Sequence, residues 1–125
     1  MKTNILVTKY DLLTDDVEVL ADGLGHFQNG KLTYYELNDP VTKHEIIFLD
    51  DRIYLRRFSE IESETELLVD EKGMFKVVSP YGVMVLESKL LVYERKEDMY
   101  MVEYQIYQEK ELISHQKIRS EGAHY

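Results

Sequence analysis

The sequence predicts an all-β protein, a closed antiparallel up-and-down β-barrel of about eight to ten strands with little helix. Two observations lead to this fold class. Hydrophobic and polar residues alternate along most of the chain, which is the period of a strand with one buried face. Turn signals separate the alternating runs, and no connection is long enough for a crossover helix. A twisted sheet of this many strands tends to close, which removes its exposed edges; a two-sheet sandwich is the alternative.

Composition limits both the architecture and the partners. With 125 residues and no evident linker, the chain is expected to form one domain over residues 1–125. It has no cysteine, which excludes disulfides, thiolate metal sites and cysteine nucleophiles. The net charge of −9 marks an acidic protein and argues against a nucleic-acid partner or an anionic membrane surface. Because neither a signal peptide nor a long apolar run is found, we expect a cytoplasmic protein with no membrane association.

The N-terminal part predicts three strands. The first covers residues 4–10, and Thr14-Asp15-Asp16 supplies the turn that follows. Residues 17–27 form the second strand, with Leu20 and Leu24 expected outside. Its inward face is expected at Val17, Val19, Ala21, Gly23, Gly25 and Phe27. Asn29-Gly30 then predicts a two-residue type I′ hairpin that places Phe27 opposite Leu32, Gly25 opposite Tyr34 and Gly23 opposite Glu36.

Two further hairpins follow. Residues 43–49 and 52–58 pair around Asp50-Asp51, with Phe48, Ile53, His44 and Arg57 placed inside and Glu45 opposite Arg56 outside. Every second residue from Glu60 to Glu66 is a glutamate, which predicts a strand with one acidic, solvated face. A three-residue loop at 71–73, with Gly73 in the left-handed region, would place Val69 opposite Phe75.

The stretch from Ser79 to Tyr107 is the longest strand-forming run. Its turn at 79–82 pairs Val77 with Met84 and directs the even positions inward: Met84, Leu86, Ser88, Leu90 and Val92. An odd-length loop around Lys96 is favoured because it sets Lys89 opposite Glu103 and keeps charge off the inner face. The same reasoning favours a three-residue loop at 109–111, which places Lys117 opposite Glu103.

The inward face is not wholly apolar. Its polar and aromatic members suggest a pocket for a small apolar or amphipathic molecule, with these candidate ligand-binding residues: Tyr34, Glu36, His44, Arg57, Tyr100, Tyr104 and Gln116. Two other interpretations remain: residues at a barrel end are simply solvated, and Glu36 with Arg57 forms a structural ion pair.

Motifs for catalysis or for metal binding are absent. The four histidines lack the spacing of metal ligands, and no nucleophile, phosphate-binding or dinucleotide-binding motif occurs. We therefore expect neither a metal nor a cofactor. General acid/base chemistry by Glu36 with His44 is the third hypothesis, after the two non-catalytic ones, since it requires only proximity.

Apolar residues also fall on the expected outer face. They are Val83, Val85, Leu91, Tyr93, Met99, Met101, Tyr107 and Ile113. So large an apolar surface is covered either by another part of the chain or by a second subunit, so the second hypothesis is a protein-interaction or structural module acting as a homodimer.

Several segments together resemble a known family. GxGxF with GKLTYYE, TKHEIIFLDDRIYLRR, GMFKVVSPYGVMVLESKLLVYER and MVEYQIY are similar to the YwiB-like family of small bacterial proteins, over about Ala21 to Arg119. The resemblance implies a calycin-type, lipocalin-like β-barrel. The family is uncharacterised, so the resemblance brings no catalytic residues to this chain.

Overall fold

The computed structural model describes residues 2–122, which form a closed barrel of ten antiparallel strands without a helix. The strands are β1 (Lys2–Asp11), β2 (Asp16–Gln28), β3 (Lys31–Tyr35), β4 (Lys43–Phe48), β5 (Arg52–Phe58), β6 (Glu62–Leu68), β7 (Lys72–Ser79), β8 (Gly82–Arg95), β9 (Met99–Gln108) and β10 (Glu111–Glu121). Each strand pairs with its sequence neighbours, and β1 pairs with β10 to close the ring. The predicted all-β up-and-down barrel is confirmed. Since these residues contain no helix, none of them forms a membrane-spanning one.

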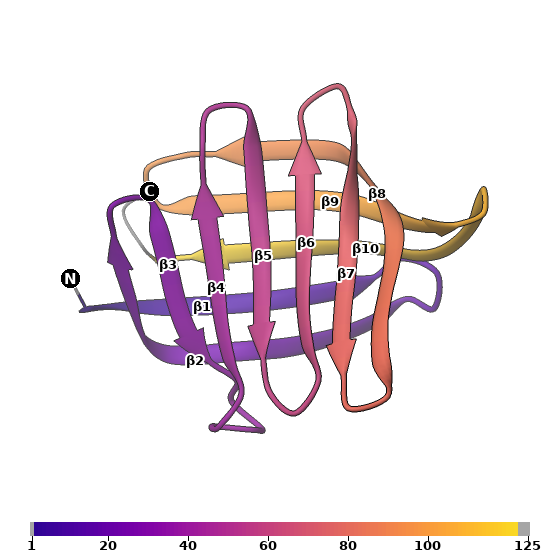
Figure 1. Cartoon of the computed structure of the whole chain (residues 1–125). Helices are drawn as coiled ribbons and strands as arrows, with labels where there is room; N and C mark the ends of the chain where they lie inside the picture. The colour runs from indigo at the N-terminus through magenta and orange to yellow at the C-terminus, as the bar shows by residue number, and fades with distance from the viewer. Residues whose placement is uncertain (1, 123–125) are drawn as a thin grey trace.

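The strands lie in two crossing layers. The short strands β3–β7 run across β1, β2, β9 and β10, and β8 bends from the first group to the second (Figure 1). Residues 82–86 of β8 pair only with β7, whereas β8 pairs with β9 from Glu87 onward. On the other side, β2 pairs with β3 only from His26 to Gln28. The two layers are therefore joined over short segments only: residues 87–89 of β8, which pair with both β7 and β9, and the three β2–β3 pairs.

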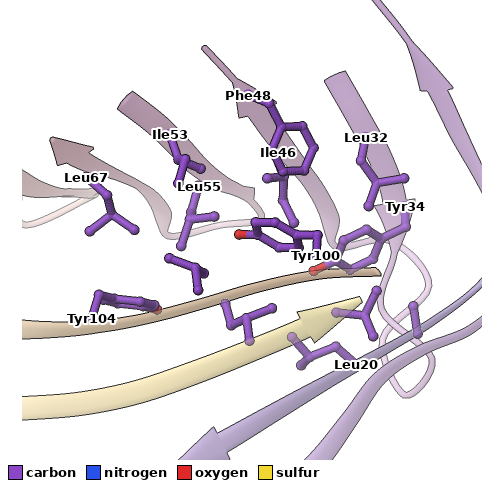
Figure 2. Packing of buried hydrophobic residues seen from close by; sticks show 14 of the residues in the cluster. Leu20, Leu32, Tyr34, Ile46, Phe48, Ile53, Leu55, Leu67, Tyr100 and Tyr104 are labelled. Atoms are coloured by element: carbon purple, nitrogen blue, oxygen red, sulfur yellow. The ribbon is translucent and has the colours of Figure 1, made fainter. Parts of the chain in front are cut away.

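An aromatic cluster within the apolar core lies at one end of the barrel. Leu32, Phe48 and Ile53 on the short strands face Tyr100 on β9 (Figure 2). The Tyr100 and Phe48 rings meet edge to face, with 4.8 Å between their centroids. Edge-to-face packing is a favoured arrangement of aromatic rings.

Turn chemistry predicted several registers correctly. Asn29 and Gly30 have φ values of 53° and 74°, which is the type I′ geometry, and Phe27 lies opposite Leu32. The further pairs expected from this hairpin, Gly25 with Tyr34 and Gly23 with Glu36, are not formed, because the β2–β3 pairing is short. All expected pairs between β4 and β5, and the Val77–Met84 pair, are present.

A β-bulge at Leu20 changes the inner face of β2. Val7 lies opposite Ala21 while Thr8 lies opposite Val19, so Leu20 is the extra residue. Leu20 and Ala21 are both buried, whereas Val17 and Val19 are 61% and 38% exposed. The inward positions predicted for these two valines, and the outward one for Leu20, are wrong because strict alternation does not continue through a bulge.

A second bulge, at Leu91, corrects the prediction for β8 and β9. The connecting loop is even-numbered, with the Lys96 N–H donating to the Met99 carbonyl. Leu91 is the extra residue, and Lys89 lies opposite Gln105 instead of Glu103. Beyond the bulge the inner face moves to Tyr93, whose ring packs against Tyr100. The extra residue of the bulge shifts the inner face by one position, which is the same shift that an odd-length loop was predicted to give.

The third bulge, at Ile113, has the same effect between β9 and β10. Glu109 and Lys110 form a two-residue turn with φ values of 49° and 71°, so the three-residue loop is wrong. Because Ile113 is the extra residue, Lys117 still lies opposite Glu103, as predicted.

The register between β6 and β7 also differs from the prediction. Thr65, not Val69, lies opposite Phe75. The positive φ of this connection, 62°, belongs to Asp70. Gly73 instead lies directly against the Glu66 carbonyl, where a Cβ would collide, so this glycine is needed for close packing rather than for a turn.

Candidate ligand-binding pocket

A pocket of about 440 Å³ occupies the barrel end opposite the aromatic core. Near its mouth lie the lower ends of β3–β7 in Figure 1, where the β3–β4, β5–β6 and β7–β8 connections gather. Its apolar lining comes from both layers of strands: Leu20, Ile46, Leu55, Phe75, Leu86, Ile106 and Ile118. Such a lining offers apolar surface to a ligand and leaves specificity to the polar groups.

Glu36, His44 and Arg57 form a connected polar group on one wall. The β4–β5 register places His44 opposite Arg57, and the β3–β4 register places Tyr34 opposite His44. Glu36 follows β3 directly, and its Oε1 lies 2.7 Å from His44 Nε2 and 3.0 Å from Arg57 Nε. Arg57 also donates from Nη1 to Ser59 Oγ at 3.2 Å. The Tyr34 and His44 rings stack, with centroids 4.9 Å apart.

The surroundings of this group set its charge states. Burial lowers the pKa of His44; the hydrogen bond with Glu36 opposes this, and the nearby charges of Arg57 and Lys9 add to it. Burial alone would raise the pKa of Glu36, but the hydrogen bonds from His44 and Arg57 outweigh it and the pKa is lowered. At neutral pH we therefore assign a carboxylate to Glu36 and a neutral imidazole to His44, whose Nε2–H donates to Glu36.

Lys9 and Glu18 lie on the opposite wall. They are direct partners in the β1–β2 register, and both line the pocket. Lys9 continues the inward series of Ile5 and Val7. Among residues 2–122 no carboxylate oxygen lies within 4.0 Å of the Lys9 ammonium. The wall therefore presents a cation that is not held in an ion pair.

Tyr104 and Gln116 supply neutral polar groups to the pocket lining. Their strands place them directly opposite each other, and the Tyr104 hydroxyl donates to Gln116 Oε1 at 2.9 Å. Burial raises the pKa of Tyr104, so its hydroxyl remains neutral at physiological pH.

The structure brings most of the sequence-predicted site residues together. Those that line the pocket are Tyr34, Glu36, His44, Arg57, Tyr104 and Gln116. Tyr100 lies apart from them, fully buried in the aromatic core between Phe48 and Tyr93. That these residues bind a ligand stays a prediction.

Sequence reasoning missed several residues of the lining. They include Lys9, Glu18, Leu20, Ser63, Thr65 and Ile113. Lys9 could have been found, since it shares the odd positions of Ile5 and Val7. Glu18 and Ile113 had no such signal, because bulges at Leu20 and at Ile113 itself turn the strand locally.

The outer apolar surface is smaller than the sequence suggested. Val83 and Val85 are 61% and 55% exposed, and Leu91 is also exposed. Met99, Met101 and Tyr107 are half-buried. Tyr93 packs against the core, so its expected outward position is wrong. Ile113 is 42% exposed and also borders the pocket. Within residues 2–122 no three histidine, aspartate or glutamate side chains gather as metal ligands.

Comparisons with protein-family models and with curated proteins gave no match. Among solved structures, the chain is similar to the crystal structure of the YwiB protein from Bacillus subtilis, with a TM-score of 0.59 and 14% sequence identity. The match covers 98% of this chain and 90% of that one. At this level of identity, the likeness concerns the fold alone and assigns no role to any residue.

Proposed function

We propose that the protein binds a small apolar or amphipathic molecule in the pocket at the open end of the barrel. One observation carries the proposal: apolar walls and convergent polar groups surround a space of about 440 Å³ at the barrel end opposite the aromatic cluster. Ligand sites in proteins commonly measure roughly 300–1,000 Å³ and combine an apolar lining with a few placed polar groups. The apolar walls would supply affinity, and the Glu36, His44 and Arg57 group would orient the ligand.

We also propose that the chain is a YwiB-like protein with a calycin-type barrel. The turn and strand motifs around Ser79–Tyr107 and the likeness to the YwiB structure support this assignment. It concerns ancestry and fold, and the ligand proposal rests on the pocket alone.

A blocking substitution tests the ligand proposal. Native mass spectrometry of freshly purified protein would detect a retained molecule, and titration with decanol would measure binding of an apolar probe. Ser63→Trp places an indole at the pocket wall, whereas Glu62→Trp places it at the neighbouring exposed position outside. We expect Ser63→Trp to weaken binding at least about tenfold and Glu62→Trp to leave it unchanged. No bound molecule and no saturable probe binding, or equal loss in both folded variants, would overturn the proposal.

Self-association is the second candidate function, and we infer that a second copy of the chain pairs along β8. The run Val77–Leu86 contains no charged residue, so two acidic copies can approach there with little repulsion. Residues 82–86 pair on one side only, and Val83 and Val85 are exposed. An exposed, uncharged, apolar strand edge is a surface that readily pairs with another strand.

A further inference from the structure

Lys9 and Arg57 approach the same part of the pocket from opposite walls. Lys9 lies on β1 and Arg57 at the end of β5, and the charges of both act on the imidazole of His44. The side chains of all three residues line the pocket. Two cations thus face the space beside a neutral, half-buried imidazole ring.

Neither cation is fully used by the protein. Arg57 binds Glu36 through Nε and Ser59 through Nη1, and its Nη2 makes no hydrogen bond with residues 2–122. The Lys9 ammonium has no ion pair among the same residues. An ammonium and a guanidinium nitrogen are therefore both available as charged donors to a ligand.

Two carboxylates, of Glu36 and Glu18, lie near Lys9 and Arg57, but neither fully neutralises their positive charge. Glu36 is already engaged by His44 and Arg57. Glu18 is exposed, whereas Lys9 is half-buried, so water screens the glutamate more than the lysine. The Lys9 ammonium is thus less solvated than the Glu18 carboxylate, and a ligand anion can bind it there.

We propose that the ligand carries a carboxylate, bound by Lys9 and by Nη2 of Arg57, while its apolar part lies against Leu55, Phe75 and Ile106. This inference rests on the proposed ligand-binding function. Hydrogen bonds from charged donors to a carboxylate are shorter and stronger than hydrogen bonds between neutral groups. The carboxylate of the ligand would therefore determine which molecules the pocket selects. A lining that combines two cations with apolar side chains matches an amphipathic acid.

Paired ligands test the head group separately from the pocket. Decanoate and decanol share the apolar chain and differ in charge. In the wild-type protein and in Lys9→Gln, we would measure binding of both by calorimetry. We expect Lys9→Gln to weaken decanoate about tenfold and to change decanol less than about twofold. Lys89→Gln removes the same charge from an exposed position on β8 and should change neither.

Glu18→Gln gives a second, opposite readout, because removing this carboxylate should tighten decanoate and leave decanol unchanged. If both ligands bind, Ser63→Trp blocks both, and Lys9→Gln alters neither or both alike, the carboxylate inference is wrong while the ligand-binding proposal stands. If neither ligand binds the wild-type protein, the ligand-binding proposal itself fails. Tighter binding of inorganic phosphate than of decanoate would show an anion site of a different class and overturn the carboxylate assignment.

Discussion

Burial is the main reason why the pKa of His44 is lowered and its imidazole is neutral, and the hydrogen bond with Glu36 opposes this effect. Tyr34 on β3 stacks on its ring, Glu36 accepts its Nε2–H, and the cations Arg57 and Lys9 disfavour a positive charge on it. The stacking and the hydrogen bond fix the orientation of the ring. The protonation of this one residue is therefore linked to folding.

We predict that stability decreases as the pH falls below about 6.5 and that His44 causes part of this decrease. The unfolded chain protonates His44 near its ordinary pKa of 6.5, whereas the folded protein does so only at lower pH. Between the folded and unfolded pKa values of His44, the unfolded state binds more protons. The free energy of unfolding therefore decreases as the pH is lowered through this range. Glu36 does not contribute in this range, because its lowered pKa lies below 4.5.

Urea denaturation at about pH 7.5 and about pH 5.5 measures this effect. Wild-type protein should lose more stability between the two conditions than His44→Gln, in which the residue cannot titrate. His26→Gln, at an exposed position on β2, should behave as the wild type. Equal losses in the wild type and in His44→Gln would contradict the assignment.

Single residues of the pocket could be predicted where a turn fixes the register. Asp50-Asp51 placed His44 opposite Arg57, and alternation placed Tyr34 and Glu36 on the same face. Alternation also predicts Tyr100 on this face, because it gives the face of a residue but not its position along the barrel. Distance from the open end depends on strand tilt and stagger, which local sequence patterns do not contain.

At the scale of strands and turns, the fold followed from alternation, and most of the errors came from bulges. Leu20, Leu91 and Ile113 each add one residue to a long strand, and each has the aliphatic side chain expected of a regular strand position. A bulge reverses the inner and outer faces beyond it, so loop parity deduced from the faces is misleading. An even-length loop with a bulge and an odd-length loop without one place the same residues of the two strands on the inner face beyond the bulge. The alternation of apolar and polar residues there cannot distinguish them.

The turn at Glu109-Lys110 is the element where the sequence fits the backbone least well. Both residues have positive φ, which costs an ordinary side chain about 1–2 kcal/mol. We predict that the double substitution Glu109→Asn with Lys110→Gly raises the free energy of unfolding by about 1 kcal/mol. Chemical denaturation measures the change.

The neighbouring turn provides a matched control for this substitution. Glu97 and Asp98 also connect two long strands, but neither has a positive φ. Glu97→Asn with Asp98→Gly should therefore give no stabilisation. A gain of the same size at both turns would mean that the backbone conformation is not its cause.

For the whole molecule, the one-sided pairing of β8 leads to a prediction about assembly. Sedimentation equilibrium at micromolar concentration should find a dimer of the wild-type chain. Val83→Lys with Val85→Lys should give a monomer, because it places charges on the exposed apolar edge. Val17→Lys with Val19→Lys changes two exposed valines on β2 and should leave the dimer intact. A monomeric wild type, or equal dissociation of both double variants, would argue against pairing through β8.

The ring is closed by its first and last strands, with Leu6–Asp11 paired to Gln116–Glu121. During synthesis, β1 can meet only β2 until β10 has left the ribosome, so closure is among the last steps of folding. The pocket has one wall on each side of this junction, with Lys9 on β1 and Gln116 on β10. A nascent chain can therefore form hairpins early, but it has no ligand site before its final strand is released, and a ligand cannot assist folding until then.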